Sequence, residues 1–147
     1  MKAQRRRRGN AITETGPALY IFFIVIFFPM LDVLGIALQY GCGWYVNHLC
    51  TRELAVRRQA EENTVKTEVN TDFTGQGMAK FLNLTPAKIT HTVTYNAPGA
   101  GQPQTVTCDT TVQATPFISV PWPYAVPGLN ADMPLTFHSE RPREETR

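Results

Sequence analysis

The chain has 147 residues and a mass of 16.5 kDa, about the length of one domain, which argues against a two-domain enzyme with a cleft between its lobes. Five of the 14 basic residues lie within residues 1–9, so without them the formal net charge falls from +2 to −3. A nucleic-acid-binding body is therefore not expected, and nucleic acid is excluded from the predicted partners.

The apolar residues crowd into one early stretch, from Ala18 to Leu38, whose only charge is Asp32. A helix rises about 1.5 Å per residue, so this stretch is long enough to cross the roughly 30 Å hydrocarbon layer of a bilayer. A run of arginines precedes it, whereas the segment after it mixes acidic and basic residues. The positive-inside rule then predicts a single-pass protein of the inner (cytoplasmic) membrane, with a cytoplasmic N-terminus and a periplasmic or extracellular C-terminus.

Helix-forming residues continue beyond the apolar stretch, so the transmembrane helix with its extracytoplasmic extension is predicted to cover residues 10–63. Residues 64–86 are interpreted as a connecting helix or linker, amphipathic in pattern and broken near Gly75 and Gly77. The long helix therefore leads into a second, shorter helical segment before the period of the sequence changes.

Residues 87–147 are interpreted as a small extracytoplasmic β module, because parts of this segment have the two-residue period of β-strands. Apolar positions alternate with threonine over 89–95 and again over 105–114, and the Gly- and Pro-rich loop 96–104 separates the two runs. A third strand is expected over 135–140. The predicted fold class is thus α+β, with a long N-terminal transmembrane α-helix followed by a small antiparallel β-sheet module. Because a domain of about 60 residues is only marginally stable alone, this extracytoplasmic module is expected to pack against the helix or against neighbouring subunits.

The segment RRRRGNAITETGPALYIFFIVIFF places a basic run, Gly9 and then Glu14 directly before the apolar helix. This arrangement resembles the leader of type IV pilins, which a prepilin peptidase cuts after the glycine on the cytoplasmic side. The resemblance implies a cytoplasmic leader peptide over residues 1–9 and a cut between Gly9 and Asn10. Glu14 then becomes the fifth mature residue, where the family has its glutamate. Inside a filament its carboxylate would be poorly solvated and would need a cationic partner, for which the new amino terminus of an adjacent subunit is one candidate.

Among pilin-like proteins, the chain is similar to the TadE-like family, the minor pilins or pseudopilins of the tight-adherence (Tad, or Flp) pilus machinery. The similarity extends from Pro17 through NHLCTRELAV, LTPAKITHTVTY and VTCDTTVQATPF to SERPREE. It implies a type IV pilin-like fold and a role in assembling a Tad-type pilus or related secretion filament that supports surface attachment. The implied partners are prepilin peptidase, other pilin-like subunits and the pilus assembly machinery. The alternative is a signal-anchored extracytoplasmic binding module that is never processed and joins no filament.

One face of the long helix is predicted to be small and polar, because its residues follow at helical intervals: Asp32, Gly35, Gln39, Cys42 or Gly43, and Asn47. Such a face suits close helix contact and inter-helix hydrogen bonds, so Asp32 and Gln39 are assigned to assembly together with Glu14. For Asp32 two other interpretations remain open: it satisfies backbone groups that Pro29 frees, or it belongs to an ion pathway.

The odd number of cysteines argues against a disulfide framework. Cys42 and Cys50 lie about 12 Å apart along one helix, too far for a bridge. A disulfide between Cys50 and Cys108 would require the sheet to fold back on the helix, and Cys108 is equally well explained as a small core residue.

No metal site, cofactor or enzymatic activity is predicted from the motifs of the chain. Neither a nucleophile motif nor a phosphate-binding glycine loop is present. Metal-ligand spacing is also missing among the three histidines, His48, His91 and His138. Any chemistry on this protein is therefore expected to be carried out by other proteins.

Overall fold

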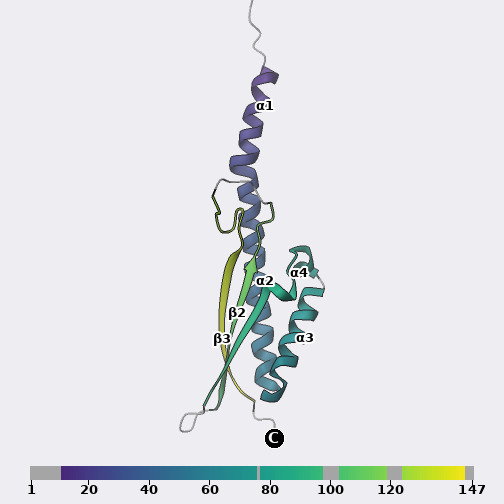
Figure 1. Ribbon diagram of the computed structural model, residues 1–147, viewed down its shortest axis with the longest axis vertical. Coiled ribbons are helices and arrows are strands. Elements are labelled where there is room, and N and C mark those ends of the chain that lie inside the picture. The colour runs from purple at the N-terminus through teal and green to yellow at the C-terminus, as the bar shows by residue number, and fades with distance from the viewer. Residues whose placement is uncertain (1–10, 76, 98–102, 119–123, 145–147) are drawn as a thin grey trace, which may run out of the picture.

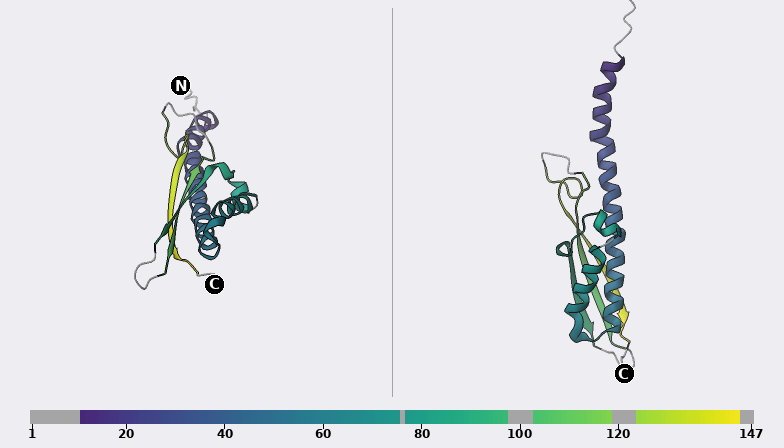
Figure 2. Two further views of the ribbon diagram at one scale, coloured as in Figure 1. Left: turned by 60° about the horizontal axis from the view of Figure 1, so that its bottom comes forward. Right: turned by 90° about the vertical axis from the view of Figure 1, so that its right-hand side faces the viewer.

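Figure 1 shows the computed structural model of the protein, which describes residues 11–75, 77–97, 103–118 and 124–144, with side chains from residue 15 onward. A long helical rod projects from a small module of helices and strands that packs against its C-terminal part (Figures 1 and 2). The rod consists of three consecutive elements: α1 (Ala11–Phe22), the π-helical turn η1 (Phe23–Phe27) and α2 (Phe28–Val56). The α+β class predicted from the sequence is confirmed.

The π-helical turn lies immediately before a proline. The backbone N–H of Phe28 donates to the carbonyl of Phe23, five residues earlier. Pro29 follows in the first turn of α2. Proline has no N–H to donate, and its ring would collide with the carbonyl four residues before it in a regular α-helix. The wider turn gives the ring room, so the rod continues through Pro29.

The long helix ends at Val56, earlier than the predicted end near Asn63. Arg57 is extended, and its guanidinium pairs with Glu68 of the following helix at 2.6 Å. No glycine or proline stands at this point of the sequence. The chain therefore turns here for a tertiary reason, because the following segment packs back along α2.

Three short helical elements connect the rod to the sheet: η2 (Gln59–Glu61), α3 (Glu62–Gly75) and α4 (Gly77–Phe81). The predicted break near Gly75 and Gly77 is confirmed, and Gly77 has a positive φ of 61°, which glycine tolerates without strain. Val65 of α3 is buried in a cluster with Cys50 and Leu54 of α2. The amphipathic face of this segment thus packs α3 beside the rod (Figure 2).

The sheet is an antiparallel meander in the order β1-β2-β3, preceded by the turn η3 (Pro86–Lys88). Its strands are β1 (Ile89–Asn96), β2 (Thr105–Ala114) and β3 (Met133–Pro142). All three predicted strands are confirmed, and the third is longer at both ends than the sequence indicated. In the register of the sheet, His91 pairs with Thr110 and Val112 pairs with Leu135.

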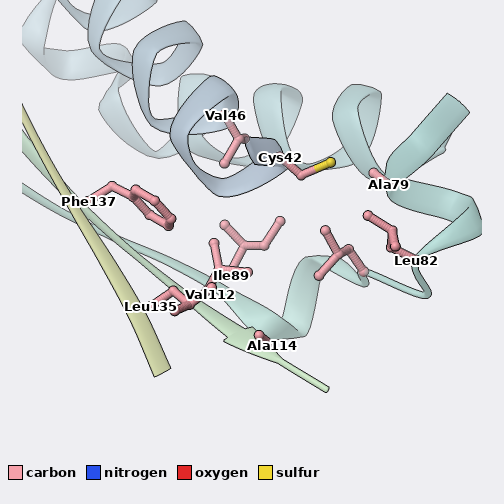
Figure 3. Close-up of a cluster of buried hydrophobic side chains, with 10 residues drawn as sticks. Cys42, Val46, Ala79, Leu82, Ile89, Val112, Ala114, Leu135 and Phe137 are labelled. Atoms are coloured by element: carbon pink, nitrogen blue, oxygen red, sulfur yellow. The ribbon is translucent and has the colours of Figure 1, made fainter. Parts of the chain in front are cut away.

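One face of the sheet packs against the rod, as expected for a module too small to be stable alone. Figure 3 shows Cys42 and Val46 of α2 facing the apolar side chains of the strands. The contact is close at Gly43, where an added Cβ would lie 2.3 Å from the ring of Phe137. The main core thus lies between α2 and the sheet, and its buried members are Cys42, Val46, Ala79, Leu82, Leu84, Ile89, Val112, Ala114, Leu135 and Phe137.

Candidate functional site

The N-terminal half of the rod has no cover from the rest of the described chain. Exposed apolar side chains surround it on all sides: Leu19, Tyr20, Ile21, Phe22, Val25, Ile26 and Met30. Within the described residues one helix, in the region Thr15–Val56, is long and apolar enough to cross a membrane. A helix that is apolar all round is typical of a membrane span or of a segment buried among other helices.

Asp32 marks the level of the rod at which the cover begins. Its side chain is fully buried, and Oδ1 accepts a hydrogen bond of 2.7 Å from the backbone N–H of Ile118. The sequence interpretation placed Asp32 inside the hydrocarbon, facing other helices or repairing the backbone near Pro29. Its partner is instead the connection between β2 and β3, which reaches up the rod to this level (Figure 1).

This contact marks the level at which the module begins to cover one face of the rod. The described rod before Asp32 covers residues 11–31, about 31 Å at a rise of 1.5 Å per residue, which still matches the hydrocarbon thickness. From Asp32 onward the module covers one face of the rod, whereas Val33 and Leu34 stay 64% and 55% exposed on the other side. The predicted span of Ala18–Leu38 lies within the apolar helix of the region Thr15–Val56, and its exact ends stay a prediction.

Gln39 joins the rod to the end of β2 through both atoms of its amide. Nε2 donates to the carbonyl of Thr115 at 2.7 Å, and Oε1 accepts from the N–H of the same residue at 3.0 Å. Thr115 directly follows the last residue of β2. The buried amide therefore satisfies both backbone groups of Thr115, as a neighbouring strand does within a sheet.

The small residues on the same helix face also contact the module. At Gly35 an added Cβ would lie 3.3 Å from Phe117, and Asn47 Oδ1 accepts a 2.8 Å hydrogen bond from the Thr110 hydroxyl. The small, polar face that was predicted to contact neighbouring helices is thus covered by the protein's own sheet and loop. An assembly role of Asp32 and Gln39 stays a prediction, and their observed contacts lie within the chain.

The proposed processing site lies at the edge of the described chain. Gly9 and Asn10 are outside the described residues. Glu14 belongs to α1, in its first turns, and its side chain lies outside the described part of the chain. The cut after Gly9 and the pairing of Glu14 therefore stay predictions from the sequence.

Cys50, His91 and Cys108 come together between the rod and the sheet. The sulfur atoms and a ring nitrogen of His91 all lie within 4.8 Å of one another. Both cysteines are fully buried free thiols, so the sheet does fold back on the helix, as a bridge would require, without a bond between them. A hydrogen bond from the Cys50 thiol lowers the pKa of Cys108 to about 5, against the effect of burial.

The sequence interpretation considered Cys50 and Cys108 as a possible disulfide pair and missed His91 beside them, because the three residues come from α2, β1 and β2 and have no common spacing. The available signal was the alternation, which places His91 and Cys108 on the inward side of adjacent strands. Only the docking of α2 brings Cys50 to the same place. No family model, curated protein or solved structure matches the chain, so its residues and geometry alone carry the functional argument.

Proposed function

We propose that this protein is a membrane-anchored minor pilin or pseudopilin that takes part in assembly of a Tad-type pilus or a related secretion filament and so supports surface attachment. The observation that carries the proposal is the uncovered apolar rod, which follows directly on a basic run and Gly9. Such a surface needs lipid or the helices of other subunits around it. A filament subunit meets both environments in turn.

Removal of the basic leader allows the rod to leave the lipid and pack among the helices of other subunits. Charged side chains at membrane depth cost about 2.5 to 3.5 kcal/mol each on insertion scales, so the arginines of residues 5–8 hold the uncut chain in the membrane. After a cut at Gly9, the new amino group of Asn10 and the carboxylate of Glu14 in a neighbouring subunit form the expected pair. Glu14 also lies near the positive end of the helix dipole.

The position of the module on the rod is compatible with such a transfer. The hydrogen bond from the loop to Asp32 and the amide contact at Gln39 both lie beyond the uncovered segment. Residues 15–31 can therefore exchange lipid for neighbouring helices without breaking these contacts. Asp32 and Gln39 would then serve assembly by holding the module at one height on the rod.

Processing by a prepilin peptidase tests the proposal. Coexpressed with such an enzyme, the chain is expected to lose residues 1–9 and to begin at Asn10, as measured by intact mass. Gly9→Val should stop the cut. Gly16→Val provides the control, because an added Cβ at Gly16 meets no described atom within 4 Å and the position lies away from the cut.

An uncut chain in the native host, or a cut beyond the apolar rod, would contradict the proposal and favour the unprocessed binding module. Glu14→Ala separates the two further. We expect this variant to be processed and to reach the membrane at normal abundance, because removing a charge makes insertion easier. Its copurification with other pilin-like subunits should fall, whereas an independent binding module would lose nothing.

A further inference from the structure

We infer that Cys50, His91 and Cys108 form a binding site for Zn²⁺ that joins the sheet to the long helix. The three ligands come from α2, β1 and β2, so a bound ion would connect the rod to two strands of the module. This inference is independent of the proposed function, because it concerns how the module is held on the rod whether or not the protein joins a filament.

The spacing of the ligand atoms suits the ion. Zn–S bonds of about 2.3 Å and Zn–N bonds of about 2.0 Å at tetrahedral angles separate the ligand atoms by roughly 3.5 to 3.8 Å. The three atoms here lie within 4.8 Å of one another, and Cys108 Sγ is 4.0 Å from Nδ1 of His91. Side-chain shifts of about 1 Å or less therefore bring the three ligand atoms to these separations, and a fourth donor completes the tetrahedron.

The hydrogen bonds of His91 leave the correct nitrogen free for a metal. Nε2 lies 2.8 Å from Oδ1 of Asn70, an acceptor, and therefore carries the proton. Nδ1, on the side of the sulfur atoms, then presents its lone pair. Histidines that bind metals characteristically donate their other ring N–H to an outer partner in this way. Asn70, on α3, has that role here.

Between the Thr110 hydroxyl oxygen and Nδ1 of His91, no proton is left to form a hydrogen bond. The Thr110 hydroxyl donates its single proton to Oδ1 of Asn47 at 2.8 Å. The same hydroxyl oxygen lies 2.8 Å from Nδ1 of His91, so two lone pairs face each other at this point. A cation between Nδ1 and the sulfur atoms removes this conflict, and the hydroxyl oxygen of Thr110, 3.7 Å from Cys108 Sγ, is the nearest further donor.

Charge and burial favour a divalent ion. As Zn²⁺ binds, both thiols release their protons to solvent, and two thiolates with a neutral imidazole balance the double positive charge. Cys50 and Cys108 are fully buried, where any uncompensated charge would be costly. A disulfide is the competing outcome: the two thiols would pass two electrons and two protons to an oxidising protein disulfide. That outcome would leave the arrangement of His91 and Asn70 without a role.

Metal titration of the full chain in detergent tests the inference. The reduced protein, first stripped with a chelator, is titrated with Zn²⁺ against a chromophoric competitor, and Co²⁺ serves as a spectroscopic probe of thiolate coordination. We expect one ion per chain and thiolate-to-cobalt absorption. Cys50→Ser and Cys108→Ser should abolish binding, and Cys42→Ser, a buried cysteine outside the cluster, should bind like the wild type.

Asn70→Ala keeps every proposed ligand and is the more discriminating variant. Loss of an outer partner of a metal-binding histidine weakens binding by roughly 10- to 100-fold, so this variant should retain the cobalt spectrum at reduced affinity. Reduced wild-type protein that takes up neither ion would overturn the inference. Normal binding by Cys50→Ser would overturn it as well, and so would a disulfide between Cys50 and Cys108 in the chain isolated from its native host.

Discussion

Replacing Gln39 by leucine tests whether its amide holds the module on the rod. Leucine has a side chain of similar volume but no polar atom, so the substitution removes both hydrogen bonds to Thr115, of 2.7 and 3.0 Å. Gln39 is 1% exposed, so water cannot replace its amide from the helix side. The N–H and carbonyl of Thr115 are left without these partners at the end of β2.

The expected cost follows from the number and burial of these groups. Each lost hydrogen bond costs about 0.5 to 1.5 kcal/mol net, and a fully buried orphan group costs about 1 to 3 kcal/mol. Thr115 is half-buried, so water partly reaches its backbone. We therefore expect Gln39→Leu to lower the free energy of unfolding by about 2 to 3 kcal/mol, which corresponds to roughly 5 to 10 °C in Tm.

Thermal unfolding in detergent, followed by near-UV circular dichroism, measures this loss. Gln113→Leu is the matched control, because Gln113 lies on the exposed face of β2, two residues before Thr115. It should unfold within about 0.5 kcal/mol of the wild type, as surface substitutions usually do. Equal stability of the two variants would refute the idea that Gln39 fastens the end of β2.

Two further contacts between rod and module give predictions of definite sign. Gly43→Ala places a methyl group 2.3 Å from the Phe137 ring and should lower the free energy of unfolding by about 1 to 3 kcal/mol. In Gly41→Ala the new methyl group meets no described atom within 4 Å, so this control should raise the free energy of unfolding by about 0.5 to 1 kcal/mol. Thermal unfolding that shifts in the same direction for both variants would contradict the packing. Asp32→Leu removes the acceptor of the Ile118 N–H and should speed protease cleavage in the loop after β2. Asp32→Asn keeps an acceptor oxygen and should be cut at the wild-type rate. Equal cleavage of both variants would show that this hydrogen bond does not hold the loop.

The helical rod and the strands could be predicted because their signals are local. The apolar stretch, the alternation in 89–95 and 105–114, and the glycines at 75 and 77 each record how neighbouring residues share one periodic backbone. The predicted antiparallel strands and the break between α3 and α4 were accordingly confirmed. Such patterns show that one face of an element is buried, and they do not identify what covers it.

The end of the long helix shows this limit. Around Val56 the sequence contains helix-forming residues and no breaker, so local propensity favoured a helix to Asn63. The helix ends earlier, where Arg57 reaches Glu68 of α3 across the turn. Packing of α3 against α2 overrides a propensity that amounts to only a few tenths of a kcal/mol per residue.

The environment of the polar helix face depended entirely on the tertiary structure. Asp32 and Gln39 lie at correct helical spacing for contact with another helix, yet their partners lie 86 and 76 residues further along the chain. Cys50 likewise meets His91 and Cys108 only because the sheet docks on this face. Helical spacing establishes that these residues share one side of the rod, because the backbone repeats every 3.6 residues. Which surface covers that side is decided by the long-range path of the loop after β2 and by the packing of the sheet, neither of which leaves a periodic trace in the sequence.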